Sequence, residues 1–503
     1  MPARLKTILI VGGGSAGWMT AALLSNLFQG LYRIRLVESE DIGTIGVGEA
    51  TIPAIKKFNE LLGLDEVQFM RLTQGTFKLG IQFNNWDKIG SSYVHGFGVI
   101  GQDLGWLRCH QYWLKMKLQG EASDFANFSI NTAAALENKF MPARTDAGDS
   151  PIGHIAHAYQ FDAGLYARFL RTYAEERGVV RQEGKIVDVN LRPDDGYVDS
   201  VVLESGETLA ADLFIDCSGF RGLIIEQAMK TGFEDWSHWL PCDRAIAVPC
   251  ERSDNFTPYT KATAHGAGWQ WRIPLQHRTG NGHVYASSYM DEAEAERILL
   301  ENLDGKPLAE PNRFRFTTGK RKQIWNRNCL AVGLAAGFLE PLESTSLFLV
   351  QSSLIRLIRL FPDGEFDQAN IDEFNRQTDF EYERVRDFII LHYKATARDD
   401  TPFWRYCRDM DVPATLARKI DLFRANGRIF REDEELFSEE SWIQVMLGQG
   451  VIPQGYDPLV DIKSEAQVAQ FLGNVENVIR KCVAVMPTHE DFVAKYCDAK
   501  APA

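Results

Sequence analysis

Apolar and polar positions at the start of the chain predict a strand, a helix and a second strand in close succession. Residues Thr7 to Val11 predict a buried strand, the pattern from Trp18 to Leu27 predicts a helix, and Ile34 to Val37 predicts a second strand. Gly12-Gly13-Gly14-Ser15-Ala16-Gly17 joins the first strand to the helix, and Glu38 follows the second strand. An acidic residue about twenty positions beyond the last glycine completes the Rossmann pattern.

The middle of the chain changes to a period of two. After an amphipathic helix that ends near Arg177, strands are expected near Lys185 to Asn190 and near Val201 to Leu203. A buried strand at Asp212 to Asp216 then ends in the small residues Cys217-Ser218-Gly219. Between about Ala245 and Met290 the alternation predicts antiparallel sheet.

The last third of the chain is mainly helical in pattern. A strand at Cys329 to Val332 runs into Gly333-Leu334-Ala335-Ala336-Gly337. An apolar helix is then expected to begin after Ser346 and to extend to about Phe361. From Gln377 onward the pattern is helical, with proline and glycine breaks. We expect one nucleotide-binding module over residues 1–376, in which a substrate-side sheet is interleaved at about 60–158 and 225–320, and a helical substrate lobe over residues 377–503.

Charge narrows the set of partners. The 54 Lys and Arg residues are outnumbered by 68 Asp and Glu residues, which gives a formal net charge of -14. Such a chain repels phosphate backbones and acidic lipid surfaces, so neither nucleic acid nor a membrane is an expected partner. The densest basic cluster, Lys320-Arg321-Lys322, is predicted to be a solvated surface element.

Cysteines and apolar runs indicate the cellular compartment in which the protein is expected. The 8 cysteines contain no C-x-x-C pair, which argues against a disulfide framework and against a structural zinc site. The longest apolar or glycine run, Ala331 to Leu339, is too short to cross a bilayer, and the residues from Met1 to Leu9 lack a secretory cleavage signal. A cytoplasmic enzyme is expected.

The glycine turn is the first element that carries chemistry. Gly12 permits the tight bend, Gly14 lets a pyrophosphate approach the backbone, and Gly17 lets the helix pack closely on the strand. Glu38 would accept hydrogen bonds from ribose hydroxyls. The strand ends at residues 217–219 and 333–337 favour FAD over a nicotinamide cofactor, because FAD is commonly enclosed by several segments that are distant in the chain. The predicted fold is therefore α/β, an FAD-binding Rossmann-like fold of the flavin monooxygenase type with an antiparallel sheet layer and a carboxy-terminal helical lobe.

Three motifs resemble one known family. Gly46-Val-Gly-Glu-Ala-Thr-Ile-Pro53, Gly268-Trp-Gln-Trp-Arg-Ile-Pro274 and Glu340-Pro-Leu-Glu-Ser-Thr345 together look like the flavin-dependent tryptophan halogenases, over nearly the whole chain. The resemblance implies that reduced FAD and O2 oxidise a halide, chloride or bromide, to hypohalous acid, which then halogenates an indole or tryptophan-like ring.

The resemblance also assigns the two catalytic residues. Lys78 lies between apolar residues, so its ammonium group either reaches solvent or is held in a partly dry site with a lowered pKa. The matching family lysine captures hypohalous acid, by hydrogen bonding or as an N-halo amine. Glu343 matches the glutamate that pairs with this lysine and assists electrophilic substitution. On its own pattern, Glu343-Ser344-Thr345 is equally typical of a helix cap.

Further site residues follow from the same likeness. Trp269 and Trp271 lie two apart on a predicted strand and so share one face, as a wall between flavin and substrate or simply as core residues. His95 and Phe97 match the residues that sandwich the indole ring. The halide is placed at Thr345 and Ser346; many family members have glycine at the latter position, which leaves the choice of chloride or bromide open. The remaining flavin contacts implied are Ser15, Ala16, Ala50, Val187, Leu334 and Leu347.

The substrate and the partners stay partly open. Segments 426–431 and 436–442 lack the tyrosine pair with which tryptophan-accepting members hold the amino acid, so indole or a larger indole compound is as plausible as free tryptophan. No second nucleotide fingerprint is apparent, which implies that a separate NAD(P)H flavin reductase supplies FADH2. Regioselectivity is not predicted, and a homodimer is an open alternative to a monomer.

Two other functions are compatible with parts of the pattern. A flavin-dependent aromatic monooxygenase shares the glycine turn, but it usually carries Gly-Asp where this chain has Gly333-Leu334. A non-catalytic protein that binds FAD or indole would need neither Lys78 nor Glu343.

Overall fold

The computed structural model of the chain describes residues 5–40, 48–253 and 256–500, and the first of its two large sheets has six strands. The inner strands are parallel, with β1 between β12 and β2, and the short edge strand β20 pairs antiparallel with β21. In order across the sheet the strands are β20 (Trp325–Asn326), β21 (Cys329–Ala331), β12 (Leu213–Asp216), β1 (Thr7–Val11), β2 (Arg33–Glu38) and β8 (Val180–Glu183).

Helix α1 (Ser15–Phe28) starts directly after the glycine turn and packs against α6 (Ala163–Glu175). The apolar run of β1 is buried, as expected for a central strand of a parallel sheet. The predicted strand, turn, helix and strand are therefore confirmed, with α1 extending beyond the predicted range at both ends.

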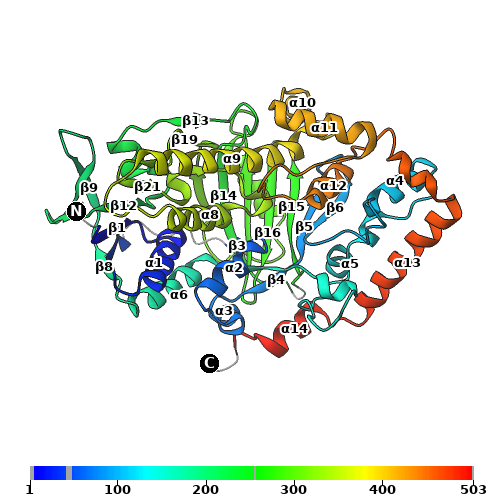
Figure 1. Cartoon of the computed structure of the whole chain (residues 1–503), viewed down its shortest axis with the longest axis horizontal. Coiled ribbons are helices and arrows are strands. Elements are labelled where there is room, and N and C mark those ends of the chain that lie inside the picture. Colours follow the sequence, from blue (N-terminus) through cyan, green and yellow to red (C-terminus); the bar gives the residue numbers. More distant parts are fainter. Residues whose placement is uncertain (1–4, 41–47, 254–255, 501–503) are drawn as a thin grey trace.

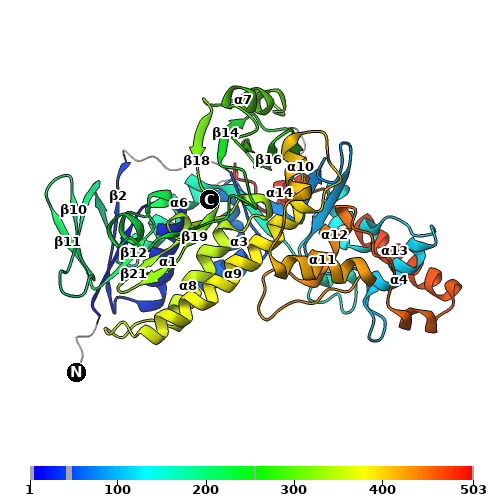
Figure 2. The same cartoon turned by 90° about the horizontal axis from the view of Figure 1, so that it is seen from above.

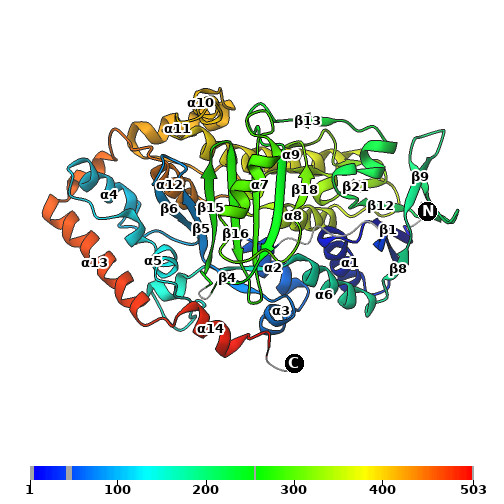
Figure 3. The ribbon, with the colours of Figure 1, turned by 180° about the vertical axis from the view of Figure 1, so that it is seen from behind.

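A seven-stranded sheet forms the second layer. It is antiparallel except where β5 pairs in parallel with β15, which confirms the predicted antiparallel layer. Helix α7 (Glu292–Glu301) lies on one face, and α9 (Gln368–Lys394) runs across the other (Figures 1 and 3). The strands in order are β18 (Asn312–Arg315), β14 (Arg244–Cys250), β17 (Thr279–Tyr285), β16 (Gly268–Pro274), β15 (Tyr259–His265), β5 (Gly80–Asn84) and β6 (Ser92–Gly96).

Three small sheets complete the β-structure. The first places β7 (Ala158–Asp162) between β3 (Gly48–Ala50) and β4 (Thr76–Lys78), and so fixes the strand that carries Lys78. The others are β11 (Thr208–Ala210), β10 (Val198–Leu203) and β9 (Ile186–Leu191), and β13 (Phe233–Asp235), β19 (Gly319–Arg321) and β22 (Gly337–Phe338).

After β22, the described residues contain helices and connecting segments but no strand. Helix α9 runs through residues 376 and 377, so the expected division at that point would cut a single helix. This helix contacts β20 of the six-stranded sheet near one end and α12 near the other, and Figure 2 shows it linking these two parts of the molecule. The other late helices are α8 (Ser346–Arg359), α10 (Pro402–Asp409), α11 (Ala414–Asn426), α12 (Glu439–Gly448), α13 (Glu465–Ala484) and α14 (His489–Tyr496).

Four earlier helices surround the small sheet of β3, β7 and β4 or extend toward α13. They are α2 (Ala54–Leu61), α3 (Glu66–Leu72), α4 (Cys109–Leu118) and α5 (Ile130–Leu136). All 8 cysteines are unpaired thiols. Within the described ranges, no helix combines the length and the apolar character needed to cross a membrane.

The basic cluster at residues 320–322 corrects a sequence expectation. Lys322 is exposed as predicted, but Lys320 and Arg321 are buried on β19, with only 1% of Lys320 exposed. The Lys320 ammonium lies 2.8 Å from Asp379 and 3.1 Å from Glu234, so acidic groups that are distant in the chain neutralise it. A run of like charges in the sequence does not reveal such partners.

Candidate active site

The glycine turn leaves an open surface where α1 begins. A Cβ atom on Gly12 (φ 111°) would lie 2.3 Å from the carbonyl oxygen of Cys217, and one on Gly17 would lie 1.8 Å from that of Gly12, so close packing requires both glycines. A Cβ on Gly14 would meet nothing within 4 Å. Free backbone amides at a helix start, beside open space, suit a pyrophosphate.

Glu38 is held against the turn. Its side chain would collide with a Cβ on Gly13, and its Oε1 accepts a hydrogen bond of 2.5 Å from Arg181 Nε. A ribose hydroxyl at this carboxylate would therefore share it with an arginine, which the sequence pattern alone did not indicate.

Several of the other expected flavin residues come together around α1. A Cβ on Gly333 would lie 2.8 Å from the Ala16 side chain, so the turn η6 (Gly333–Ala335) that contains Leu334 adjoins the first turn of α1, which begins at Ser15. Leu347 is buried in α8, which contacts both α1 and η6.

Two expected flavin residues lie on other sheets. Ala50 is buried on β3, whereas Val187 lies on β9 with 56% of its surface exposed. Residues 46 and 47, which open the first family motif, lie outside the described residues.

Lys78 is completely buried at the end of β4. Its Nζ donates a 2.7 Å hydrogen bond to Ser344 Oγ and lies 5.4 Å from the centre of the Phe97 ring. Burial lowers the pKa of Lys78 to about 7, and the negative charge of Glu343 opposes this shift only in part. The structure therefore places the Lys78 ammonium group in a dry site and not in contact with solvent.

Glu343 is also fully buried, in the single turn η7 (Pro341–Glu343). Its Oε2 lies 2.9 Å from His95 Nδ1, and its Oε1 lies 2.8 Å from His392 Nε2. Burial alone would raise the pKa of Glu343, but the charges and hydrogen bonds of the two histidines lower it to about 2. The carboxylate is thus ionised near neutral pH.

Ser344 stands between the two catalytic candidates. Among the described residues, no ion pair joins Lys78 directly to Glu343; the lysine bonds to the next side chain along the turn instead. Ser344 adopts a left-handed backbone conformation (φ 58°), which is unfavourable for a residue with a side chain. Strain of this kind is often found at functional sites.

The two tryptophans share one face of β16. Their ring centres are 6.2 Å apart with planes inclined at 60°, and Trp269 is buried. Trp269 Nε1 donates a 2.9 Å hydrogen bond to Glu340, which also accepts one of 2.5 Å from Tyr393. Burial raises the pKa of Glu340 to about 7, against the effect of these two donors.

The start of α8 differs from the expected cap. Thr345 is the N-cap residue, but its side chain makes no capping hydrogen bond, and its buried Oγ1 has no partner among the described residues. Ser346 is the first residue of the helix. A buried hydroxyl without a partner at a helix amino end is compatible with an anion site.

Aromatic rings surround His95, which is itself buried. The centres of Phe388 and Phe437 lie 5.7 and 6.4 Å from the centre of its ring, and these two phenylalanines stack on each other at 3.8 Å. Trp442 packs edge-on behind Phe388. Apolar rings beside a histidine and a lysine can enclose a flat aromatic molecule.

Sequence reasoning missed four contributors to the site: Ser344 as a partner of Lys78, Glu340, His392 and Tyr393. The only sequence signal for the last two was a histidine and a tyrosine that follow Ile389-Ile390-Leu391 in a helix. Polar rings in an apolar run indicate a buried polar contact, but they do not name its partner.

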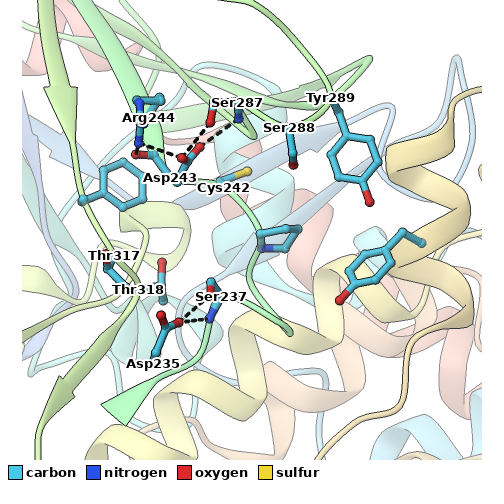
Figure 4. Close-up of a pocket in the computed structure, with 13 residues that line it drawn as sticks. Asp235, Ser237, Cys242, Asp243, Arg244, Ser287, Ser288, Tyr289, Thr317 and Thr318 are labelled. Atoms are coloured by element: carbon cyan, nitrogen blue, oxygen red, sulfur yellow. Dashed lines mark hydrogen bonds and ion pairs between the residues drawn. The ribbon is translucent and has the colours of Figure 1, made fainter. Parts of the chain in front are cut away.

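A surface cleft of about 480 Å³ lies elsewhere, lined in part by Asp243, Ser287 and Tyr289 (Figure 4). Asp243 is already paired with Arg244 at 2.6 Å and accepts two hydrogen bonds from Ser287. None of the residues predicted from the sequence for the site lines this cleft.

Comparisons with known proteins agree with the motifs. The tryptophan halogenase family model matches residues 7–465. Tryptophan 7-halogenase RebH of Lentzea aerocolonigenes is 33% identical over 98% of this chain and 99% of its own length.

Solved structures show the same likeness along the whole chain. Xcc4156, a flavin-dependent halogenase from Xanthomonas campestris, superimposes with a TM-score of 0.96 at 45% identity, with all of both chains covered. BrvH, a flavin-dependent halogenase from Brevundimonas sp. BAL3, gives a TM-score of 0.94 at 46% identity, covering 98% of this chain and 99% of its own.

The glycine turn yields the first prediction. Gly14→Ala should fold normally, because its Cβ enters open space, but should weaken FAD binding about tenfold or more, equivalent to about 1.4 kcal/mol. Gly17→Ala should instead unfold at a lower temperature, because its Cβ collides with the backbone of Gly12. Fluorescence titration with FAD and thermal unfolding measure the two effects. Unchanged FAD affinity in Gly14→Ala would contradict the assignment.

The second prediction concerns stability. The pKa of Lys78 falls from 10.5 in the unfolded chain to about 7 in the folded protein, so between about pH 7 and 10.5 the unfolded chain binds one proton more than the folded protein. Lys78→Met should therefore be more stable than the wild type at pH 7, by on the order of 2–4 kcal/mol. The difference should shrink as the pH rises from about 7 toward 10.5.

Urea unfolding at several pH values checks this prediction. Lys320→Met serves as the control, because it removes a buried lysine that has an acidic partner at 2.8 Å, and it should bring no such gain. A Lys78→Met protein that is less stable than the wild type at pH 7 would show that the lysine is not held in an unfavourable dry site.

Proposed function

The chain belongs to the tryptophan halogenase family and is a flavin-dependent halogenase, and on this premise we propose that it uses FAD to halogenate an indole ring with Lys78 and Glu343 as catalytic residues. The observation that carries the proposal is the buried group formed by Lys78, Ser344, Glu343 and His95. A neutral or weakly basic amine and an ionised carboxylate are held together there, without access to water.

FAD binding is supported by the open surface at Gly14, by the adjoining turn at Leu334 and by Glu38 at the end of β2. When bound and reduced, the flavin together with O2 supplies the oxidising power that converts a halide to hypohalous acid. A separate NAD(P)H flavin reductase is the proposed source of FADH2. The unpartnered Thr345 Oγ1 and the amide end of α8 at Ser346 are the proposed halide site.

Lys78 is suited to receive the oxidised halogen. With its pKa near 7, a large share of its side chain is neutral amine at neutral pH, whereas an ordinary lysine is almost fully protonated. A neutral amine has a lone pair that can bind electrophilic halogen, and Ser344 Oγ holds Nζ in place. Glu343, ionised and immobile, is the proposed base for the ring proton.

The paired tryptophans separate the flavin, where the halide is oxidised, from the site where the aromatic substrate is halogenated. Trp269 is locked by its hydrogen bond to Glu340, and Trp271 fills the space above Gly282, where even a Cβ atom would lie 2.0 Å from its ring. Such a wall lets a small oxidant pass while it keeps an aromatic substrate away from the flavin. We assign the substrate side to Phe97 and His95.

The substrate proposal is an indole without a strict requirement for the amino acid group. The aromatic neighbours of His95 are Phe388 and Phe437, which offer surface to a ring but no hydrogen bond to an ammonium or carboxylate. The segment 426–442 contains no tyrosine.

The third prediction tests the function directly. Purified protein with a flavin reductase, NADH, FAD, O2, bromide and indole should form bromoindole, detected by mass spectrometry. Lys78→Met and Glu343→Gln should each lower the rate by about 10²-fold or more while binding FAD normally. Lys320→Met, which alters a buried lysine outside the site, should keep the wild-type rate.

Each outcome has a clear meaning. Hydroxylated indole formed without bromide would identify a monooxygenase instead. Bromoindole formed at the wild-type rate by Lys78→Met would show that the lysine is not part of the reaction.

A further inference from the structure

His392 is a buried histidine whose hydrogen atoms can be placed from its surroundings. It lies near the end of α9, with no exposed surface, and its Nδ1 is 2.8 Å from the carbonyl oxygen of Phe388, one turn earlier. A carbonyl oxygen can only accept a hydrogen bond, so Nδ1 carries a hydrogen. The backbone around the ring is held as well, because Gln449 donates a 2.5 Å hydrogen bond to the carbonyl of His392.

The other ring nitrogen then faces a second acceptor. Nε2 lies 2.8 Å from Glu343 Oε1. In a neutral imidazole with a hydrogen on Nδ1, Nε2 has only a lone pair, and a carboxylate oxygen also only accepts. Two acceptors at this distance repel each other unless a proton lies between them, on either the imidazole or the carboxyl group.

Glu343 already has a donor in His95, whose Nδ1 lies 2.9 and 3.1 Å from the two carboxylate oxygens. The contact with His392 therefore needs a proton of its own. The alignment of His392 falls outside ideal hydrogen-bond geometry, although the distance is short. Contacts of this kind are often poorly aligned before substrate binds.

Few groups can exchange a proton with His392. Its ring is enclosed by Phe83, Trp86 and Phe388, none of which titrates. The ionisable groups at this cluster are Glu343 on η7, His95 and Tyr93 on β6, and Lys78 on β4. Tyr93 is partly buried with its hydroxyl fully enclosed, and this burial together with the charge of Glu343 keeps its pKa well above the usual range. In the part of the chain that the structure describes, Glu343 is the ionisable group in direct contact with Nε2.

From these contacts we propose that His392 is a positioning residue that acts through Glu343: the two side chains share one proton, which leaves the pair through Glu343 and returns to it during each halogenation. This inference rests on the proposed function. It identifies His392 as the residue that exchanges a proton with Glu343, a role that no motif in the sequence indicated.

The proton balance of the reaction fits such a pair. Conversion of Ar–H and hypohalous acid, HOX, to Ar–X and H2O forms a carbon–halogen bond and breaks the O–X bond, whose electrons leave with oxygen. The departing hydroxide takes one proton. The ring carbon then loses one proton, and the C–H electron pair restores the aromatic system. A group that first gives and then regains a proton leaves no net change.

The shared proton also sets the strength of the base at each stage. While the proton lies between Glu343 and Nε2, the carboxylate is a weak base. Once that proton has gone to the departing hydroxide, the carboxylate faces a bare lone pair, and the repulsion strengthens it as a base at the moment when the ring proton must leave. The returning proton restores the contact.

The fourth prediction compares His392→Gln and His392→Asn with the wild type. In single turnovers with FADH2, O2, bromide and indole, both should lower the rate constant for bromoindole formation about 10²-fold, and KM for indole should stay within about twofold. Fully deuterated indole should react more slowly than ordinary indole in the variants but not in the wild type, because loss of the ring proton becomes rate-limiting.

His283→Gln is the matched control. His283 is also completely buried, and its Nδ1 lies 2.9 Å from the carbonyl of Ala295, but it lies on β17, where its ring packs against His265 and Tyr285. This variant should show whatever instability follows from removing a buried histidine, without the isotope effect. His392 variants with the wild-type rate and no isotope effect would overturn the proposal.

Two further results separate the possible failures. If the wild type forms no bromoindole, the proposed function is wrong, and the role of His392 falls with it. If both His392 variants fail to fold, NMR spectra of the 15N-histidine-labelled wild type still decide the question, since one of the 10 histidines should show Nε2 sharing a proton, and that signal should change in Glu343→Gln. Absence of such a signal would overturn the inference.

Discussion

The site depends on a buried negative charge at Glu343. Moving a carboxylate out of water costs several kcal/mol unless donors surround it, and here the donors come from elsewhere in the chain. His95 reaches it from β6 and His392 from α9, while Lys78 approaches from β4 through Ser344. The carboxylate becomes stable only when these elements meet, so the long helix α9 and the two small strands are needed as much as the nucleotide-binding unit.

The contacts of Glu343 with two histidines explain why the pKa of Lys78 is low. Because the histidines occupy the carboxylate, the lysine forms no direct ion pair with any described residue, and burial dominates its pKa. Its nearest partner is a neutral hydroxyl on Ser344, whose left-handed backbone conformation costs about 1–2 kcal/mol. The fold therefore accepts an unfavourable lysine and a strained serine at one place, as is common where reactivity is required.

The sequence predicted features that depend on residues close together in the chain, and it missed those that depend on distant residues. The strand, glycine turn and helix at residues 7–28 are determined by local contacts, such as Gly17 against Gly12, and were predicted closely. Lys320 was misjudged because its partners Glu234 and Asp379 lie 86 and 59 positions away, which no local pattern shows. His392 was missed for the same reason. Lys78 and Glu343 were identified through family motifs, whereas the serine between them became visible only in the folded chain.

The motif Glu340-Pro-Leu-Glu343 holds two carboxyl groups in opposite states. Both are completely buried, yet the pKa of Glu340 is raised to about 7 and that of Glu343 is lowered to about 2. The donors explain the difference: Glu340 is bound by the neutral groups of Trp269 and Tyr393, whereas Glu343 is bound by imidazoles that can carry charge. Pairs of groups whose environments separate their pKa values commonly divide the roles in a reaction. By this reasoning, the first carboxyl group fixes the tryptophan wall, and the second is free to handle protons.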